Sequence, residues 1–214
     1  PDPRDYKVSF SNVIKLPTSI DLSANCTPPK DQGQLGSCTA FATLAGMEYN
    51  EKKYNANKIN SIFSERFTYY VTRVDILGWT TADSGAYVRS AIQAIVKYGA
   101  CLSSSFPYNT DYTTVPPANV YNEAQKYQVV TYARFAEKTN INDIKANLSA
   151  GFPTIIGFAA FSNIWTSKNG VIPPPNNQVI GGHAVILVGY DDQKQMFKFK
   201  NSWGSSWGDK GYGY

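Results

Sequence analysis

The chain has 214 residues, 43% of them hydrophobic and 17% charged, a composition that suits one large domain or two lobes around a shared cleft and excludes a disordered chain. Its 20 lysines and arginines outnumber its 16 aspartates and glutamates, giving a net charge of +4, and they are scattered along the sequence. We therefore expect no nucleic-acid partner. No stretch approaches the roughly 18 consecutive apolar residues of a membrane span, so we also expect no membrane association.

The first half of the chain predicts an extended arm followed by helices. Residues 1 to about 30 contain five prolines and little periodicity, so we expect an arm laid over the surface of the protein. Apolar residues at helical spacing predict a helix from about Cys38 to Tyr54. Two further helices are predicted, at about 65–74 with Ser64 as N-cap, and at about 86–98 closed by Gly99.

The second half changes from helical to strand patterns. Residues 102–118 are rich in proline and small polar residues and indicate a crossover between two lobes. Pro173 to Pro175 predict a stiff loop that leads into a glycine turn at Gly181 and Gly182. The remaining elements are predicted as a short helical piece near 120–127, a helix at 141–150, and strands at about 128–135, 153–158, 183–190 and 196–200. The pattern indicates the α+β class, with a helical first half and a sheet-rich second half.

The residues around Cys38 favour a reactive thiol. Gly33 and Gly36 precede it, and the helix predicted to start there would place the thiol at a helix N-terminus. Unpaired amide donors and the helix dipole stabilise a thiolate at such a position. Most cysteines are simply buried apolar residues, so this position alone leaves a structural role open.

The other two cysteines, Cys26 and Cys101, leave the redox compartment open. If they pair, Cys38 is the free thiol and the compartment is oxidising, but the sequence does not give the Cα separation that a disulfide requires. One histidine and three widely spaced cysteines offer no ligand cluster, so we expect no metal and no cofactor.

His183, the only histidine, opens an apolar strand directly after two glycines. A lone histidine is more often structural than catalytic, yet imidazole titrates near neutral pH and is the natural base for a cysteine. Asn201 follows a probable strand, and its side-chain carbonyl can orient an imidazole. Trp203 could keep water off that hydrogen bond, although the segment 201–208 by itself would suit a turn that only packs.

Together these pieces resemble the papain family of cysteine peptidases. The cysteine, histidine and asparagine occur in the family's order, and the asparagine lies slightly later than is usual. The matching motifs are Gln32-Gly33 with Gly36-Ser37-Cys38, Gly182-His183-Ala184-Val185, and Asn201-Ser202-Trp203-Gly204 with Trp207-Gly208. The resemblance implies a two-lobed α+β fold, with a helical N-terminal lobe, an antiparallel β-barrel-like C-terminal lobe, and an active-site cleft between them.

The resemblance also implies domain boundaries. The peptidase domain would cover residues 17–214, with the helical lobe at about 30–115 and the β-rich lobe at about 116–214. Residues 1–16 would be an N-terminal arm or a remnant of a propeptide.

By the same resemblance, the chain would hydrolyse peptide bonds through a thioester at Cys38. His183 would act as base and then acid, and Asn201 would orient it. The Gln32 side chain and the Cys38 backbone N–H would form the oxyanion hole. Residues expected to bind substrate are Gly85, Gly157, Gly182 and Trp203.

Two departures from the family pattern suggest a divergent or bacterial-like branch. Leu35 stands where the family usually has a cysteine, so a common disulfide cannot form, and Thr39 replaces the usual aromatic residue after the nucleophile. Packing under the helix at Phe41 and Leu44 is expected to replace that covalent brace.

Two alternatives stay open, a transpeptidase or ligase on the same fold and an inactive papain-like binding module. The expected partners are polypeptide substrates and a propeptide or protein inhibitor in the cleft. We expect a monomer and a secreted, endomembrane or periplasmic location.

Overall fold

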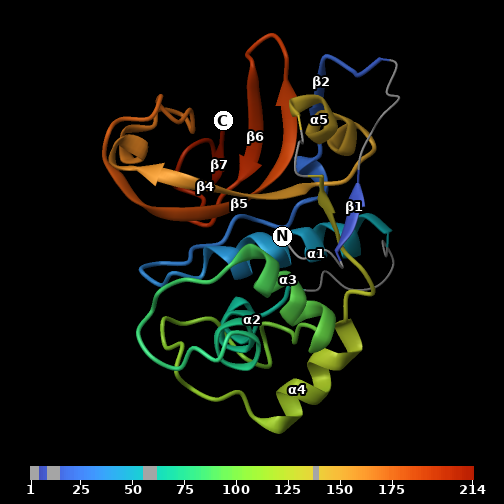
Figure 1. The fold of residues 1–214 in the computed structure, drawn as a ribbon, viewed down its shortest axis with the longest axis vertical. Helices are drawn as coiled ribbons and strands as arrows, with labels where there is room; N and C mark the ends of the chain where they lie inside the picture. The colour runs from blue at the N-terminus through green and yellow to red at the C-terminus, as the bar shows by residue number, and fades with distance from the viewer. Residues whose placement is uncertain (1–4, 9–14, 55–61, 137–139) are drawn as a thin grey trace.

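Helix α1 (Cys38–Tyr54) lies between a helical half and a sheet half of the molecule (Figure 1). The computed structural model describes residues 5–8, 15–54, 62–136 and 140–214. On one side α1 packs against strand β5 (Val179–Asp191), and on the other against helices α2 (Glu65–Val71) and α3 (Val88–Lys97). The two halves therefore meet along the helix that Cys38 opens.

The helices of the helical half begin and end largely where local sequence chemistry predicts. Helix α1 has the predicted bounds. The Ser64 side chain caps α2, as expected, by accepting a hydrogen bond from the backbone N–H of Phe67. The chain continues as a π-helical turn, η2 (Thr72–Ile76), so the regular helix is shorter than the predicted 65–74. Helix α3 is closed by Gly99, whose φ of +80° is the left-handed conformation that glycine adopts without strain.

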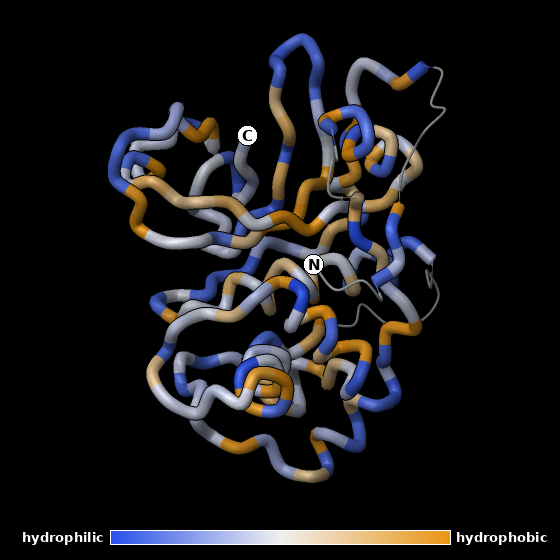
Figure 2. Tube along the Cα trace, viewed as in Figure 1, coloured by the Kyte–Doolittle hydropathy of each residue, from blue (hydrophilic) through white to orange (hydrophobic). Residues whose placement is uncertain are grey.

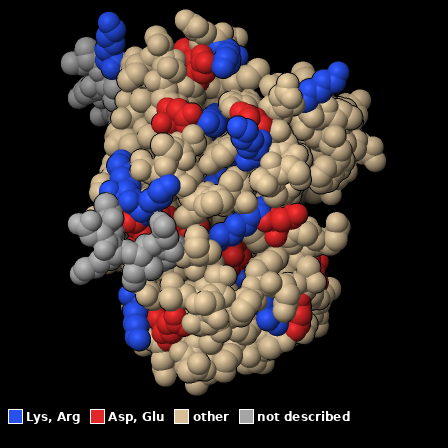
Figure 3. Space-filling view, turned by 180° about the vertical axis from the view of Figure 1, so that it is seen from behind, with Lys and Arg blue, Asp and Glu red and all other residues tan. Residues whose placement is uncertain are grey.

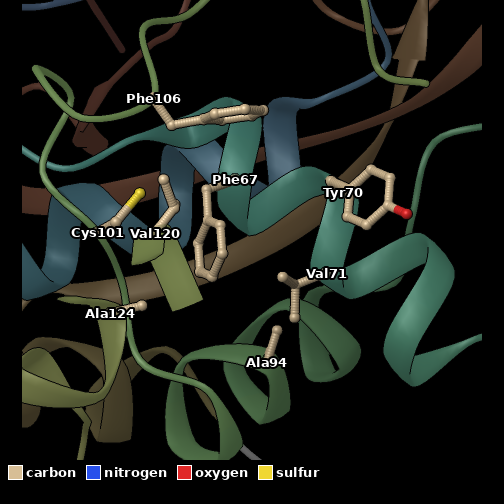
Figure 4. Packing of buried hydrophobic residues seen from close by; sticks show 8 residues of the cluster. All are labelled: Phe67, Tyr70, Val71, Ala94, Cys101, Phe106, Val120 and Ala124. Atoms are coloured by element: carbon tan, nitrogen blue, oxygen red, sulfur yellow. The ribbon is translucent and has the colours of Figure 1, made fainter. Parts of the chain in front are cut away.

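The core of the helical half forms where α2 and α3 meet helix α4 (Ala118–Ala124) and the segment that holds Cys101 and Phe106 (Figure 4). Helix α4 and the 3-10 turn η3 (Gln125–Tyr127) correspond to the helical piece predicted near 120–127. The buried side chains of this cluster are Phe67, Tyr70, Val71, Ala94, Cys101, Phe106, Val120 and Ala124. Each large apolar side chain buried there stabilises the fold by roughly 1.5–3 kcal/mol.

The sheet half is built on β5. The first part of β5 pairs antiparallel with β4 (Thr154–Phe161), and its last residues pair with β2 (Ser19–Asp21) on the same edge. On the other edge lie β6 (Met196–Lys200) and then β7 (Tyr212–Gly213). Two 3-10 turns, η1 (Ser23–Asn25) and η4 (Ser162–Thr166), follow β2 and β4.

Both faces of β5 are covered by helices. Ile186 and Val188 face α1, and Val185 and Leu187 face helix α5 (Ile141–Ser149). This alternation is the two-residue period of a strand, and burial on both faces explains the continuous apolar run (Figure 2). The strand that carries His183 is therefore fixed from both sides.

Two predictions for the strands are wrong. Of the predicted strand 128–135 only β3 (Ala133–Phe135) forms, and it pairs in parallel with β1 (Tyr6–Val8). Gly181 and Gly182, expected in a turn, lie inside β5 opposite β4. Gly181 and Gly182 adopt an extended conformation because they pair with the backbone of β4. The local sequence does not reveal that β4 lies beside them.

The described part of the N-terminal arm, residues 5–8, is anchored through Asp5. The Asp5 carboxylate is buried and accepts two hydrogen bonds from the Arg89 guanidinium, at 2.9 and 2.8 Å, and one from the Tyr132 hydroxyl at 2.7 Å. A bidentate pair of this kind fixes geometry as well as energy. The predicted arm or propeptide remnant at 1–16 also includes residues 1–4 and 9–14, which lie outside the described residues.

All three cysteines are free thiols, so the Cys26–Cys101 disulfide that the sequence left open is not formed. Cys26 packs with Tyr49 and Val188 against the sheet. Cys101 lies in the core of the helical half (Figure 4). The two thiols belong to separate hydrophobic clusters and are not brought into the geometry that a disulfide requires.

On the face opposite that of Figure 1, the described residues show no concentration of one charge. Figure 3 shows acidic and basic side chains interspersed there, which gives no extended basic footprint for a nucleic acid on that face. Among the described helices, none is long and apolar enough to cross a membrane.

Candidate active site

The Cys38 thiol lies at the first residue of α1 and is partly exposed. Burial raises the pKa of this thiol, whereas the backbone N–H groups of Ala184, Thr39 and Cys38 itself lower it. The helix N-terminus thus stabilises the thiolate as predicted, but burial has the larger effect, and the pKa lies above its ordinary value.

His183 is oriented by a hydrogen bond of 2.8 Å between its Nε2 and Asn201 Oδ1. The backbone N–H of Ser202 donates to the same oxygen at 2.9 Å, which identifies that atom as the amide oxygen. Nε2 must therefore carry the proton and donate, because the oxygen can only accept. This tautomer leaves His183 Nδ1 unprotonated and able to act as a base.

Cys38 and His183 lie on α1 and β5, two elements that pack against each other. The Ala184 N–H that lowers the pKa of the thiol belongs to the residue directly after His183. Burial lowers the pKa of His183, and the bond to Asn201 opposes this effect. In each group burial disfavours the charged form.

Trp203 covers the histidine. Its indole stacks on the His183 ring with centroids 4.5 Å apart and an interplanar angle of 22°. Trp165 and Trp207 pack on Trp203 in turn, at 4.8 and 5.1 Å between centroids. An aromatic layer of this kind limits the access of water to the ring and restricts its rotation.

Gln32 is 7% exposed, and both ends of its side-chain amide are held. Ser202 Oγ donates to Gln32 Oε1 at 2.5 Å, and Gln32 Nε2 donates to the Leu35 carbonyl at 2.8 Å. The backbone N–H of Gln32 also donates to the Ser202 carbonyl at 2.9 Å. Because the amide nitrogen carries two protons, one N–H of Gln32 stays available to a ligand.

Two residues that sequence reasoning missed hold the loop before Cys38. Tyr108 donates to the Gln32 carbonyl at 2.8 Å, and its hydroxyl lies 2.8 Å from Ser37 Oγ. Asp83 Oδ2 accepts the backbone N–H of Gly36 at 2.7 Å. Neither contact has a local sequence signal, since each joins segments more than 40 residues apart in the chain.

Gly85 lies against the loop before Cys38. A Cβ atom added at Gly36 would come within 3.2 Å of Gly85 Cα, so this close approach requires glycine. The Gly85 carbonyl accepts a hydrogen bond from Arg73 Nη1 at 2.8 Å.

The other two predicted substrate-binding glycines flank His183 on the sheet side. A Cβ atom at Gly157 would lie 3.8 Å from the His183 carbonyl and 4.0 Å from a methyl group of Val88. A Cβ atom at Gly182 would meet nothing within 4 Å. Space is therefore open at Gly182, the residue directly before His183.

The chain has relatives among known proteases. Residues 16–214 match the family model described as papain family cysteine protease. An uncharacterised peptidase C1-like protein of Acanthamoeba polyphaga mimivirus is 36% identical, over 99% of this chain and 77% of its own length. Cysteine proteinase 2 of Entamoeba histolytica is 29% identical, and the alignment covers 96% of this chain and 65% of that protein.

Solved structures show the same fold. Xylellain, a cysteine protease from Xylella fastidiosa, superimposes with a TM-score of 0.89 at 32% identity, over 100% of this chain and 85% of that one. The bromelain protease from Ananas comosus, solved in complex with the E64 inhibitor, gives a TM-score of 0.74 at 25% identity over 92% of this chain and 88% of that one. The chain, with its two halves and its cysteine, histidine and asparagine in place, belongs to the papain family of cysteine proteases.

Proposed function

We propose that this cysteine peptidase cleaves polypeptide substrates through a covalent thioester on Cys38. The observation that carries the proposal is the single orientation of His183, with Nε2 donating to Asn201 and Nδ1 left as a base beside the helix that Cys38 opens. An activated nucleophile needs a base that is itself held by a third group, and these three side chains meet that requirement.

The proposed reaction begins with attack of the Cys38 sulfur on the scissile carbonyl carbon, as the thiol proton passes to His183 Nδ1. The remaining N–H of Gln32 and the backbone N–H of Cys38 stabilise the oxyanion. His183 then gives the proton to the leaving amine, and a thioester forms. A water molecule, deprotonated by His183, hydrolyses the thioester and restores the thiol.

Labelling with an epoxide probe of the E64 type tests these roles. We expect the folded wild-type protein to be alkylated once, at Cys38, and to lose peptide hydrolysis with the same time course. Cys38→Ala should not react, and His183→Ala should react at least about 100-fold more slowly because the thiol loses its base. Labelling of Cys26 or Cys101 instead would contradict the assignment.

Product analysis by mass spectrometry separates hydrolysis from acyl transfer. With a peptide substrate and an added amine nucleophile, we expect the carboxylic acid product to dominate. A dominant amide product would instead favour the ligase alternative, in which an amine captures the same thioester.

The proposed substrate preference is an apolar side chain two positions before the cleaved bond. Gly157 and Gly182 contribute no charge beside the histidine, and Val88 contributes a methyl group. Such a surface gives an acidic or basic side chain no partner after desolvation. A peptide library that shows a preference for charge at this position would refute the proposal.

A propeptide or protein inhibitor in the cleft, a monomeric state and a secreted, endomembrane or periplasmic location are parts of the same proposal. The E64 complex of the related bromelain supports occupation of the cleft by an inhibitor. Disulfides give no support to the proposed location, because the three cysteines are unpaired. Cell fractionation and light scattering would test the location and the monomer.

A further inference from the structure

Four charged side chains gather behind the catalytic pair. Lys30 Nζ contacts Glu48 Oε1 at 2.7 Å and also contacts Glu65 Oε1. Glu48, Glu65 and Lys200 are 2%, 3% and 6% exposed. Burying charged groups costs free energy even when they are paired. A cluster of four charged side chains in the interior therefore needs a physical explanation.

This charged cluster joins both halves of the molecule. Glu48 lies on α1 and Glu65 opens α2, whereas Lys200 ends strand β6. Lys200 Nζ donates to Thr27 Oγ1 at 2.9 Å, and Thr27 Oγ1 donates to Glu48 Oε2 at 2.5 Å. Lys200 is also the residue directly before Asn201.

A cavity of about 20 Å³ separates the charged cluster from the catalytic residues. Its wall includes all four charged side chains, Asn201, residues 41, 42 and 45 of α1, and residues 184 and 185 of β5. A site needs roughly 10–15 Å³ and two or more polar partners to hold one water molecule. This cavity meets both conditions, and it lies between the helix of Cys38 and the strand of His183.

The amide nitrogen of Asn201 needs a partner in that cavity. Asn201 is 4% exposed, and its Oδ1 accepts from His183 and Ser202. Among the described residues, Asn201 Nδ2 has no hydrogen-bond partner. Buried side-chain donors are rarely left unpaired, because the lost hydration costs roughly 1–3 kcal/mol.

We infer that the cavity binds one ordered water molecule that accepts a hydrogen bond from Asn201 Nδ2 and donates to the carboxylates of Glu48 and Glu65. Lys200 lines the same cavity and adds a polar group to its wall. The two glutamates and Lys200 are then positioning residues: they hold the Asn201 amide, and Asn201 holds His183. The inference rests on the roles proposed above for Cys38, His183 and Asn201.

The arrangement explains why the buried charges lie where they do. With Nδ2 held, the amide plane cannot rotate, so Oδ1 keeps facing His183 Nε2. A carboxylate is a strong acceptor for a bound water, and a charge-assisted hydrogen bond is roughly twice as strong as a neutral one. The orientation of the base is thereby fixed by groups from α1 and α2 as well as by the sheet.

The matched pair Ala42→Val and Ala42→Thr tests the water. Ala42 lines the cavity on α1, and the two new side chains have the same shape, but only threonine carries a hydroxyl that can accept from Asn201 Nδ2. We expect Ala42→Val to displace the water and lower kcat about tenfold, with KM unchanged. Ala42→Thr should keep kcat within about threefold of the wild type.

A second pair tests the charged cluster. Lys200→Met should lower kcat without a change in KM, because the cavity loses a polar partner. Lys198→Met, on the same strand but bonded to Asp21 and Ser23, should leave kcat unchanged. Thermal unfolding of all four variants checks that each is folded at the assay temperature.

A crystal structure of the Cys38→Ala protein gives a readout that does not depend on activity. We expect a water within about 3.2 Å of Asn201 Nδ2. Its absence at high resolution, or equal kcat for the folded Ala42→Val and Ala42→Thr proteins, would overturn the inference. Failure of the proposed function is a separate result, since it would appear as a wild-type protein that neither hydrolyses peptides nor reacts with the epoxide.

Discussion

Cys38 and His183 are held in place by different means. His183 lies on β5, which pairs with β4 and β6 and is covered by apolar side chains on both faces. Cys38 follows a loop that is held by separate hydrogen bonds to Asp83, Tyr108 and Ser202. A strand inside a sheet moves only if many bonds break together, whereas single contacts between loops can fail one at a time.

The difference teaches how this chain works without a covalent brace before its nucleophile. Leu35 stands where the family usually has a cysteine, and it packs with Ala40 and Tyr69. The restraint that one disulfide would give is shared among several weak contacts. We therefore expect mutations on the histidine side to act steeply on catalysis, and mutations on the cysteine side to act in graded steps.

The largest effect should come from Asn201→Ala, on the histidine side. The change removes the partner of His183 Nε2, so the ring can rotate and its tautomer is no longer set. We expect kcat for a peptide substrate to fall about 100-fold, with little change in KM. Asn201→Gln tests whether an amide alone is enough; retention of full activity in Asn201→Ala would mean that Trp203 orients the ring without help.

A smaller effect is expected for Asp83→Ala, on the cysteine side. The Gly36 N–H and the Tyr69 hydroxyl both lose their acceptor, so the loop before Cys38 loosens. We expect kcat/KM to fall about tenfold and the free energy of unfolding to drop by about 1 kcal/mol. Asp83→Asn retains an acceptor oxygen, so its kcat/KM should lie between the values of the wild type and of Asp83→Ala. An unchanged rate of epoxide labelling in Asp83→Ala would argue against a role of Asp83 in holding the loop before Cys38.

Tyr108→Phe should have a weaker effect on the same loop. The ring keeps its edge-on contact with Phe41, at 5.0 Å between centroids, and only the hydroxyl bonds to Gln32 and Ser37 are lost. We expect kcat/KM to fall about threefold, and stability by about 1 kcal/mol. Tyr6→Phe, at a side chain that is 72% exposed, is the matched control. A loss as large as that of Asp83→Ala would show that the two contacts are not independent.

The smallest effect concerns pH, and it reports on the histidine side alone. Burial lowers the pKa of His183 from its ordinary value of 6.5. The unfolded chain therefore binds a proton at a higher pH than the folded chain does. The stability contributed by neutral His183 is complete above pH 6.5 and is lost as the pH falls towards the lowered pKa.

Nuclear magnetic resonance of the Cys38→Ala protein measures this shift, because His183 is the only histidine of the chain. We expect its imidazole resonance to titrate below pH 6.5. The part of the slope of stability that lies just below pH 6.5 should disappear in a Cys38→Ala, His183→Gln protein. A midpoint above 6.5 would mean that nearby charge, and not burial, controls the base.

Local chemistry was enough to predict much of the fold. The bounds of α1 follow from helical periodicity, and Ser64 caps α2 because its hydroxyl accepts the Phe67 N–H. The prediction failed where pairing between distant segments decides the outcome. Gly181 and Gly182 became strand because β4 lies beside them, and most of 128–135 found no strand partner among the described residues.

The site shows the same division. Cys38, His183, Asn201 and Gln32 could be named as candidates from their motifs, because each role needs a particular functional group at a particular place, and these roles stay predictions. Asp83, Tyr108 and the charged cluster around Lys30 could not be named, because nothing near them in the chain indicates what they touch.

The sequence by itself thus determined which groups are the candidates for the chemistry and which segments form the main helices and strands, since both depend on residue type and short-range spacing. Only the tertiary structure decided the direction in which burial shifts the pKa of Cys38 and of His183, the free state of Cys26 and Cys101, and the contacts that hold the loop before Cys38. Burial, disulfide formation and loop contacts all depend on residues that are far apart in the sequence. Such residues come into contact only when the two halves of the molecule pack against α1.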